Sequence, residues 1–402
     1  MVMPMSFQIA RVKGISIRLH FTILVTFVLI SWTVAVRLTP NIYPDLSSIE
    51  YWTAGILGAI VLFLSVTLHE LSHSVMAKRY GLHVHEIILF IFGGVSNIED
   101  LDAFGERKIN NGKEVSKEFK KEFTIAVAGP VASFILAGGF SLLFLLISQG
   151  TLQTESVLNK VVGVILLYGA IVNTGLGIFN LVPAFPLDGG RILRAVIFKW
   201  KHDYQRATKI AAKTGVILSY AFMAVGFMIM IFGDFFGGTW ILLVGWFLNN
   251  GAQSYMSQYD LTSLLVGIRL RDIMNTNIIS LKEMFTVGYC LREYFNKYAK
   301  DSFPVLDEQG RLRGLVTFKD AINTVETKRD STYAEEIMIP ADNLIMSPLG
   351  YADEALLKMT NRPVKKVFVC DEEGKLLGLV SKTDIIDIAV QRKEHMKMVK
   401  NN

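Results

Sequence analysis

Long apolar stretches without charged residues alternate with short polar segments over roughly the first 250 residues of this chain. Such stretches predict membrane-spanning helices, because about 20 apolar residues are needed to cross the hydrocarbon core of a bilayer. We place six spans at about 21–38, 53–77, 123–147, 160–182, 211–232 and 238–250, of which the last is short. Residues 1–255 are therefore expected to form an α-helical polytopic membrane domain in contact with the lipid bilayer.

Beyond residue 256 the pattern becomes that of a soluble α/β domain containing a gapless internal repeat of 64 residues. Residues 303–320 match 367–384, and 272–274 match 336–338. In each copy two apolar runs are joined by a turn of the form Asp-Glu-x-Gly, which is a β-hairpin signal, and a hydroxyl residue then precedes an Asp by three positions. We expect two related domains within 256–402, at about 268–328 and 332–392.

Composition supports an integral membrane protein with a soluble part, since 51% of the residues are hydrophobic and the net charge is only +5. Lys and Arg concentrate in the loops on one side of the predicted spans, while the other side has Arg37 and Lys160 near span ends. The positive-inside rule then places both termini and the repeat domain in the cytosol, at the plasma membrane. Nucleic-acid binding is not expected.

Two further features agree with this topology. The segment before Arg18 lacks an apolar core, so no cleavable signal peptide is expected and the first span should remain as an anchor. Cys290 and Cys370 both fall in the soluble part, at positions that do not match in the repeat. Reduced thiols in a cytosolic domain are the simplest interpretation.

The segment His69-Glu70-Leu71-Ser72-His73 follows a charge-free run that starts at Trp52. Residues four apart share one face of a helix, so the two imidazoles can bind one metal ion, and the adjacent carboxylate can accept a proton from a water on that metal. The same five letters also occur on ordinary surface helices.

The membrane environment favours the metal-site interpretation of this segment over an ordinary surface helix. An ionisable residue at membrane depth costs about 2.5–3.5 kcal/mol, so a Glu between two histidines there indicates a functional site. Lys78 and Arg79 should mark the water boundary, which places His69 about 14 Å inside it.

A catalytic zinc needs a third protein ligand and one open position. The best candidate is Asp188, because the two prolines and two glycines between 180 and 190 should unwind the fourth span near its cytosolic end. A helix cap at the membrane surface is the alternative for this carboxylate. His83 and His85 lie outside metal-ligand spacing and are expected to be surface or strand residues.

These residues resemble the two defining motifs of the site-2 protease family of intramembrane zinc metalloproteases. The resemblance covers residues 10–230 and rests on the His69–His73 motif, on the set Asn180, Pro183, Pro186, Leu187, Asp188, Gly189 and Gly190, and on the segments 92–95 and 128–130. It implies one Zn²⁺ per chain held by His69, His73 and Asp188, with Glu70 as the general base. It also implies that Asn180 stabilises the oxyanion or positions the peptide, whereas we expect Asn173 to join helices.

The apolar segment 87–98 is too short to span as a helix and predicts strands, giving a small membrane-embedded β-sheet. Its edge, near Gly93 and Gly94, could pair with an extended substrate by strand addition, as the resemblance also implies, although a purely structural hairpin is the alternative. The polar segment 100–121 after it is expected to be a hinge or lid loop. The expected partner is a membrane protein whose transmembrane segment is cleaved.

The repeat resembles a tandem pair of cystathionine-β-synthase-type (CBS) domains. In nucleotide-binding members of that family the hydroxyl residue and the Asp contact phosphate and ribose, which would assign ATP or AMP binding to Thr317, Asp320, Ser381 and Asp384. Simple helix capping is the alternative for these residues, and many such pairs only form homodimers. The leading hypothesis for the chain is a zinc-dependent intramembrane endopeptidase with this sensing or dimerisation module. The rival hypothesis is a membrane transporter or channel with a regulatory CBS pair.

Overall fold

The computed structural model of the chain describes residues 6–91, 93–98, 112–149, 156–341, 344–360 and 365–401. The chain divides into two compact units, residues Met1–Tyr259 and Asp260–Asn402. The first unit is helical with one small sheet, and the second is an α/β unit, which confirms the predicted fold class.

The first unit begins with two strands and continues through long helices. Its elements are β1 (Ser6–Val12), β2 (Ile15–His20), α1 (Ile23–Thr33), the π-helix η1 (Val34–Leu38), α2 (Thr39–Ile42), α3 (Ser48–Arg79), β3 (Val84–Phe90), β4 (Gly93–Ile98), α4 (Gly112–Gln149), α5 (Val157–Asn180), α6 (Asp188–Lys201), α7 (Tyr204–Ile231) and α8 (Phe235–Leu265), whose last turns belong to the second unit.

Five helical segments within the described residues are long and apolar enough to cross a membrane. They are Ile23–Ile42, Ser48–Arg79, Glu114–Ser148, Val157–Asn180 and Tyr204–Ile231. The sixth predicted span, 238–250, lies inside α8, which is not among them and which turns polar at Asn249 and Asn250.

Glycine allows the spanning helices to approach one another closely, as is common when helices associate in lipid. A Cβ added at Gly55 on α3 would lie 2.3 Å from the carbonyl oxygen of Ser31 on α1. On α5, a Cβ at Gly169 or Gly177 would lie 2.8 or 2.9 Å from the rings of Phe140 or Phe134 on α4. These glycines therefore bring α1 close to α3 and α4 close to α5.

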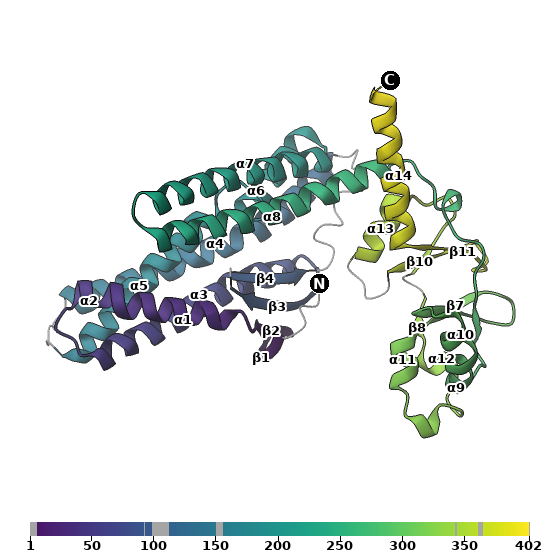
Figure 1. Ribbon diagram of the computed structural model, residues 1–402, viewed down its shortest axis with the longest axis horizontal. Helices are drawn as coiled ribbons and strands as arrows, with labels where there is room; N and C mark the ends of the chain where they lie inside the picture. Colours follow the sequence, from purple (N-terminus) through teal and green to yellow (C-terminus); the bar gives the residue numbers. More distant parts are fainter. Residues whose placement is uncertain are drawn as a thin grey trace. The chain divides into compact units, whose positions relative to one another are not determined.

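The four strands of the first unit form one sheet in the order β1-β2-β3-β4 (Figure 1). The predicted strands at 87–98 are confirmed as β3 and β4, an antiparallel pair. The partner strands β1 and β2 were not predicted, because their alternating pattern gains meaning only when β2 pairs in parallel with β3. The sheet leaves β4 at its edge.

The predicted loop at 100–121 is wrong from Gly112 onward, where α4 has already begun. Residues 99–111 lie outside the described residues. The extension is helical because Lys and Glu are good helix formers and because Val115 and Glu122 are buried. Phe198 and Tyr204 pack against Val115 and close this end of the helix onto α6 and α7.

The second unit contains two halves that follow the sequence repeat, each with one small sheet. Its elements are the 3₁₀-helix η3 (Leu270–Asp272), β5 (Leu281–Lys282), α9 (Val287–Tyr289), the π-helix η4 (Cys290–Phe295), α10 (Asn296–Tyr298), β6 (Ser302–Leu306), β7 (Leu312–Thr317), α11 (Phe318–Asn323), the 3₁₀-helix η5 (Glu326–Lys328), α12 (Ala334–Ile337), β8 (Ile339–Pro340), β9 (Ile345–Met346), α13 (Ala352–Thr360), β10 (Lys366–Cys370), β11 (Leu376–Ser381) and α14 (Lys382–Asn401).

The predicted hairpins of the repeat are confirmed as β6–β7 and β10–β11. Gly310 and Gly374 take positive φ angles of 78° and 83° in the two turns, which favours glycine at these positions. Leu312 N donates to Gly374 O and Leu376 N donates to Gly310 O, so the two turns bind each other.

Cys290 and Cys370 are buried and form no disulfide. Burial raises the pKa of each thiol to about 11, so both stay protonated at neutral pH. This agrees with two reduced, unreactive core thiols.

A buried ion pair joins α4 to α6. Arg194 Nε donates to Glu122 Oε1 at 2.6 Å, and the guanidinium lies over the rings of Phe185 and Tyr204, at 5.0 and 4.7 Å from the ring centroids. Removing one partner of a buried pair is costly because the other charge stays in a medium of low polarity.

Arg194→Met is therefore expected to lower the free energy of unfolding by about 3 kcal/mol. Thermal unfolding in detergent would measure it, beside Arg206→Met, whose side chain is 75% exposed. The double variant Arg194→Met with Glu122→Leu should regain much of the lost free energy of unfolding. Equal midpoints for Arg194→Met and Arg206→Met would contradict the assignment.

Candidate metal centre

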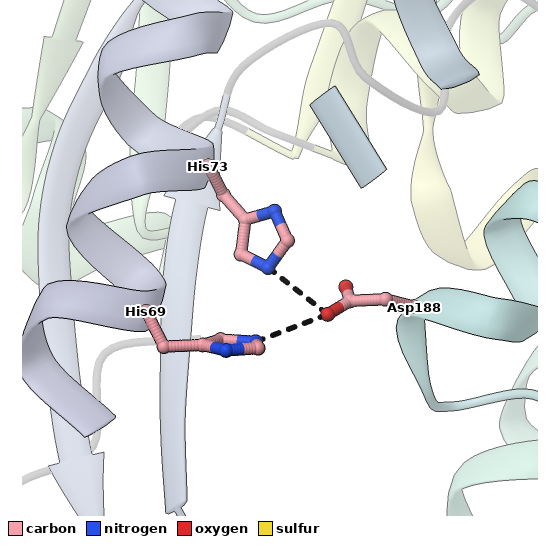
Figure 2. A group of neighbouring side chains, drawn as sticks. All are labelled: His69, His73 and Asp188. Carbon is pink, nitrogen blue, oxygen red and sulfur yellow. Dashed lines mark hydrogen bonds and ion pairs between the residues drawn. The ribbon is translucent and has the colours of Figure 1, made fainter. Parts of the chain in front are cut away.

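Three side chains from two helices converge inside the first unit. His69 Nε2 and His73 Nε2 lie 3.1 and 3.0 Å from the same oxygen, Asp188 Oδ2 (Figure 2). The two imidazoles point from consecutive turns of α3, and Asp188 is the first residue of α6. All three residues are buried, and one ligand atom from each lies within 4.8 Å of the others.

Hydrogen bonds at the far side of each ring set the chemistry of this group. His73 Nδ1 lies 2.7 Å from the carbonyl oxygen of Ile125, which can only accept, so Nδ1 carries the proton and Nε2 presents a lone pair when the ring is neutral. His69 Nδ1 lies 2.8 Å from Ser133 Oγ. In the tautomer in which His69 Nδ1 donates to Ser133, both Nε2 lone pairs face the carboxylate. Lone pairs and a carboxylate repel one another without a cation, so this donor set fits a zinc ion.

Gly129 on α4 has no side chain and so keeps the space in front of the imidazoles open. A Cβ at this position would lie 2.1 Å from His73 Nε2 and 2.6 Å from His69 Nε2. Any side chain here would therefore occupy the volume in which the nitrogens meet. The structure gives a physical reason for the Gly of the Ala128-Gly129-Pro130 segment.

A folded loop carries Asp188 to the histidines. Helix α5 ends at Asn180, as the prolines and glycines predicted, and α6 begins at Asp188. A Cβ at Gly189 would lie 2.2 Å from Val182 O, and one at Gly190 would lie 2.4 Å from Phe185 N. The two glycines therefore allow the loop to fold back onto the first turn of α6.

Phe185 holds this loop in place from the other side. Its side chain is 1% exposed and stacks on Tyr255 of α8, with 4.1 Å between ring centroids. A Cβ at Gly215 of α7 would lie 2.2 Å from Phe185 O, so α7 also touches the loop backbone. Packing from α7 and α8 thus fixes where Asp188 begins its helix.

Glu70 lies beside the group and faces the sheet. Ser96 Oγ on β4 donates to Glu70 Oε2 at 2.8 Å. A Cβ at Gly94 would lie 2.4 Å from Glu70 Cγ, so this glycine lets β4 pass directly over the carboxylate. Of the two glycines predicted to touch substrate, Gly94 therefore lies at the site.

A cavity of about 300 Å³ opens onto these residues. Glu70, His73 and Asp188 line it together with Gly94, Val95, Ser96 and Ile98 of β4. Because β4 is the edge strand of its sheet in the described part of the chain, its outer side is available to a polypeptide in the cavity.

Other predicted residues fall at or away from the cavity. Asn180 lines it, and its Nδ2 donates to Leu176 O at 3.0 Å. Asn173 donates to Ser65 Oγ on α3 at 2.8 Å, which confirms that it joins helices. Gly93 has a φ of 135° and is not among the cavity residues, and Phe92 lies outside the described residues. His83 and His85 are exposed, as expected.

Several residues at the site were not predicted from the sequence. Among them are Ser133, which contacts His69; Ser96, which holds Glu70; and Arg191, which lines the cavity. Ser96 and Ser133 carry no motif signal. Arg191 directly follows the two glycines after Asp188, and that position was the only available clue.

In the second unit the predicted hydroxyl–carboxylate pairs cap helices. Thr317 Oγ1 donates to Asp320 Oδ2 at 2.5 Å, and Ser381 Oγ donates to Asp384 Oδ2 at 2.7 Å. Each hydroxyl also accepts a bond from the backbone N–H of its Asp, at 3.2 Å in both cases. The capping alternative is therefore present in both copies, and all four side chains remain partly exposed.

The sequence matches peptidase family M50 over residues 57–165 and 150–222, and the CBS domain over 270–326 and 335–390. It is 32% identical to a zinc metalloprotease of Methanocaldococcus jannaschii, over 96% of this chain and 96% of that protein. The chain belongs to the site-2 protease family. Rip3 of Mycobacterium tuberculosis is 28% identical over 94% of this chain and 91% of its own length.

Among solved structures, the site-2 protease from M. jannaschii shares 31% identity and covers 62% of this chain and 94% of its own, with a TM-score of 0.37. The match to peptidase family M50 lies within the membrane unit, which is therefore related to peptidases. The transporter hypothesis thereby loses its basis. The chain is an integral membrane protein of a zinc metalloprotease family with a C-terminal CBS pair.

Gly129→Ala is expected to remove most of the bound zinc, because the added methyl group would occupy the space in front of His69 and His73. Zinc content of the purified protein would measure this. Gly138→Ala is the matched control on the same helix, since a Cβ there meets nothing within 4 Å among the described residues. Full zinc content in a folded Gly129→Ala protein would contradict the site.

Proposed function

We propose that this protein is a zinc-dependent intramembrane endopeptidase that cleaves a transmembrane segment of another membrane protein. The observation that carries the proposal is the convergence of His69, His73 and Asp188 beside Glu70, in a cavity bordered by an edge strand. Membership of a zinc metalloprotease family supports the reaction class.

His69, His73 and Asp188 would hold the zinc ion through two Nε2 atoms and Oδ2. When bound, zinc lowers the pKa of a water toward neutrality and polarises the scissile carbonyl. Glu70 accepts a proton from the attacking water and passes it to the leaving amine nitrogen. Ser96 keeps the Glu70 carboxylate pointing into the cavity through its 2.8 Å hydrogen bond.

Substrate main chain would lie along β4. A peptide bond inside a transmembrane helix is hydrogen-bonded internally, so the segment must become extended before it can be cut. The edge of β4, with Gly93 and Gly94 at its start, offers backbone hydrogen bonds to such an extended segment. Asn180, which also lines the cavity, would position the peptide or stabilise the oxyanion.

The distribution of Lys and Arg predicts a protein of the plasma membrane. Both termini, the metal site and the CBS pair would then face the cytosol. This orientation gives water and cytosolic effectors access from one side. The CBS pair would then act as a regulatory module, through adenine nucleotide binding or through homodimer formation.

The test of the proteolytic function compares wild type with Glu70→Gln in liposomes containing a model single-span substrate. We expect cleavage by wild type alone, with about one zinc per chain retained in both proteins. Loss of the general base should slow cleavage by at least about 100-fold. Absence of tightly bound zinc in wild type would refute the proposal.

Adenine nucleotide binding by the CBS pair is a separate prediction. ATP or AMP should bind the full-length protein in titration calorimetry, and Asp320→Ala combined with Asp384→Ala should weaken binding at least about tenfold, because each Asp would bind ribose hydroxyls. Asp330→Ala is the control, since its carboxylate is exposed and paired with Arg292. Absence of binding to wild type would leave dimerisation as the role of the module.

A further inference from the structure

Arg191 lies in the metal-site cavity without a role in the scheme above. It follows Asp188 by one helical turn on α6 and lines the cavity together with Glu70. Its side chain is 14% exposed, and its Nη1 lies 4.0 Å from Asp188 Oδ1. The two imidazoles contact the other oxygen of the same carboxylate, Oδ2. The guanidinium therefore lies next to the reaction centre.

The two other nitrogens of Arg191, Nε and Nη2, are buried and have no hydrogen-bond partner among the residues that the structure describes. Leaving a buried donor unpaired costs about 1–3 kcal/mol, and more for a charged group. Arg194, one turn further along the same helix, shows the usual solution, because its Nε donates to Glu122. Both arginines line the cavity, but Arg194 is paired within the fold, whereas Arg191 keeps two buried donors without a partner among the described residues.

The geometry of these donors selects the acceptor. Nε–H and one Nη2–H form the same edge of the guanidinium and run parallel, which matches two oxygens of one anion. A neutral peptide carbonyl offers one oxygen and no charge. A carboxylate offers two oxygens and a full charge, and hydrolysis creates such a group at this place.

We propose that Arg191 binds the carboxylate of the new C-terminus that peptide hydrolysis creates, and stabilises its negative charge as it forms. This inference rests on the proposed function. In the reaction a C–O bond forms to the carbonyl carbon and the C–N bond breaks. Both protons of the water end on the amine, which leaves as an ammonium group, and the carboxylate stays in the cavity that Arg191 lines.

The test is binding of a hydrophobic tetrapeptide, acetyl-Leu-Val-Ala-Leu, as the free acid and as the C-terminal amide. Full-length protein is titrated with its zinc and again after chelation, because zinc itself attracts carboxylates. In the chelated wild type the acid should bind about tenfold more tightly than the amide, as expected for a charged two-point hydrogen bond.

Arg191→Gln should bind acid and amide equally after chelation, while its zinc content before chelation stays at the wild-type level. Arg191→Lys should keep part of the preference, since it retains the charge and loses the fork. Arg206→Gln, on the exposed face of α7, should behave as wild type.

Equal binding of acid and amide to chelated wild type would overturn the inference, as would a preference that survives Arg191→Gln. The cleavage assay separates this outcome from failure of the proposed function. A wild type that cuts its substrate and shows no preference for the acid would leave the protease in place and remove the role of Arg191.

Discussion

The structure depends on the meeting of one carboxylate with two imidazoles across two helices. Asp188 Oδ2 lies within 3.1 Å of His69 Nε2 and His73 Nε2, and all three residues are buried. Such a cluster of donors is stable only when a cation or protons balance it, because buried like charges and lone pairs repel. The positions of α3 and α6, and of the loop before α6, follow from the need to hold this geometry.

Close backbone approach is the means by which the chain builds the cavity. Gly129 clears the volume in front of the imidazoles, Gly94 lets the edge strand cross Glu70, and Gly189 and Gly190 let the loop fold onto α6. In lipid, helices gain little from burying apolar surface against one another, so small residues at contacts are the main way to bring backbones together. The same device that packs the bundle therefore also opens the site.

The soluble unit shows how an internal repeat becomes a single body. Leu315 pairs with Ile339, and Leu379 pairs with Asn275, so a segment near the start of each repeat adds to the hairpin of the other copy. A Cβ at Gly314 would meet Met338, and one at Gly378 would meet Met274. Each half is therefore completed by residues of the other.

The sequence by itself determined the local chemistry. Helical spacing brought His69 and His73 onto one face, the prolines and glycines ended α5 at the right place, and the repeat defined the second unit and its hairpins. These features could be predicted because each depends on residues a few positions apart or on a pattern that recurs in the chain.

Only the tertiary structure decided which distant side chains serve the site. Ser96 on Glu70, Ser133 on His69 and Arg191 beside the cavity belong to elements far from the histidines in sequence. Strands β1 and β2 likewise became recognisable only through pairing with β3, and the start of α4 through packing on α6 and α7. Side-chain contacts across elements depend on helix crossing and strand register, and single-sequence spacing does not encode these directly.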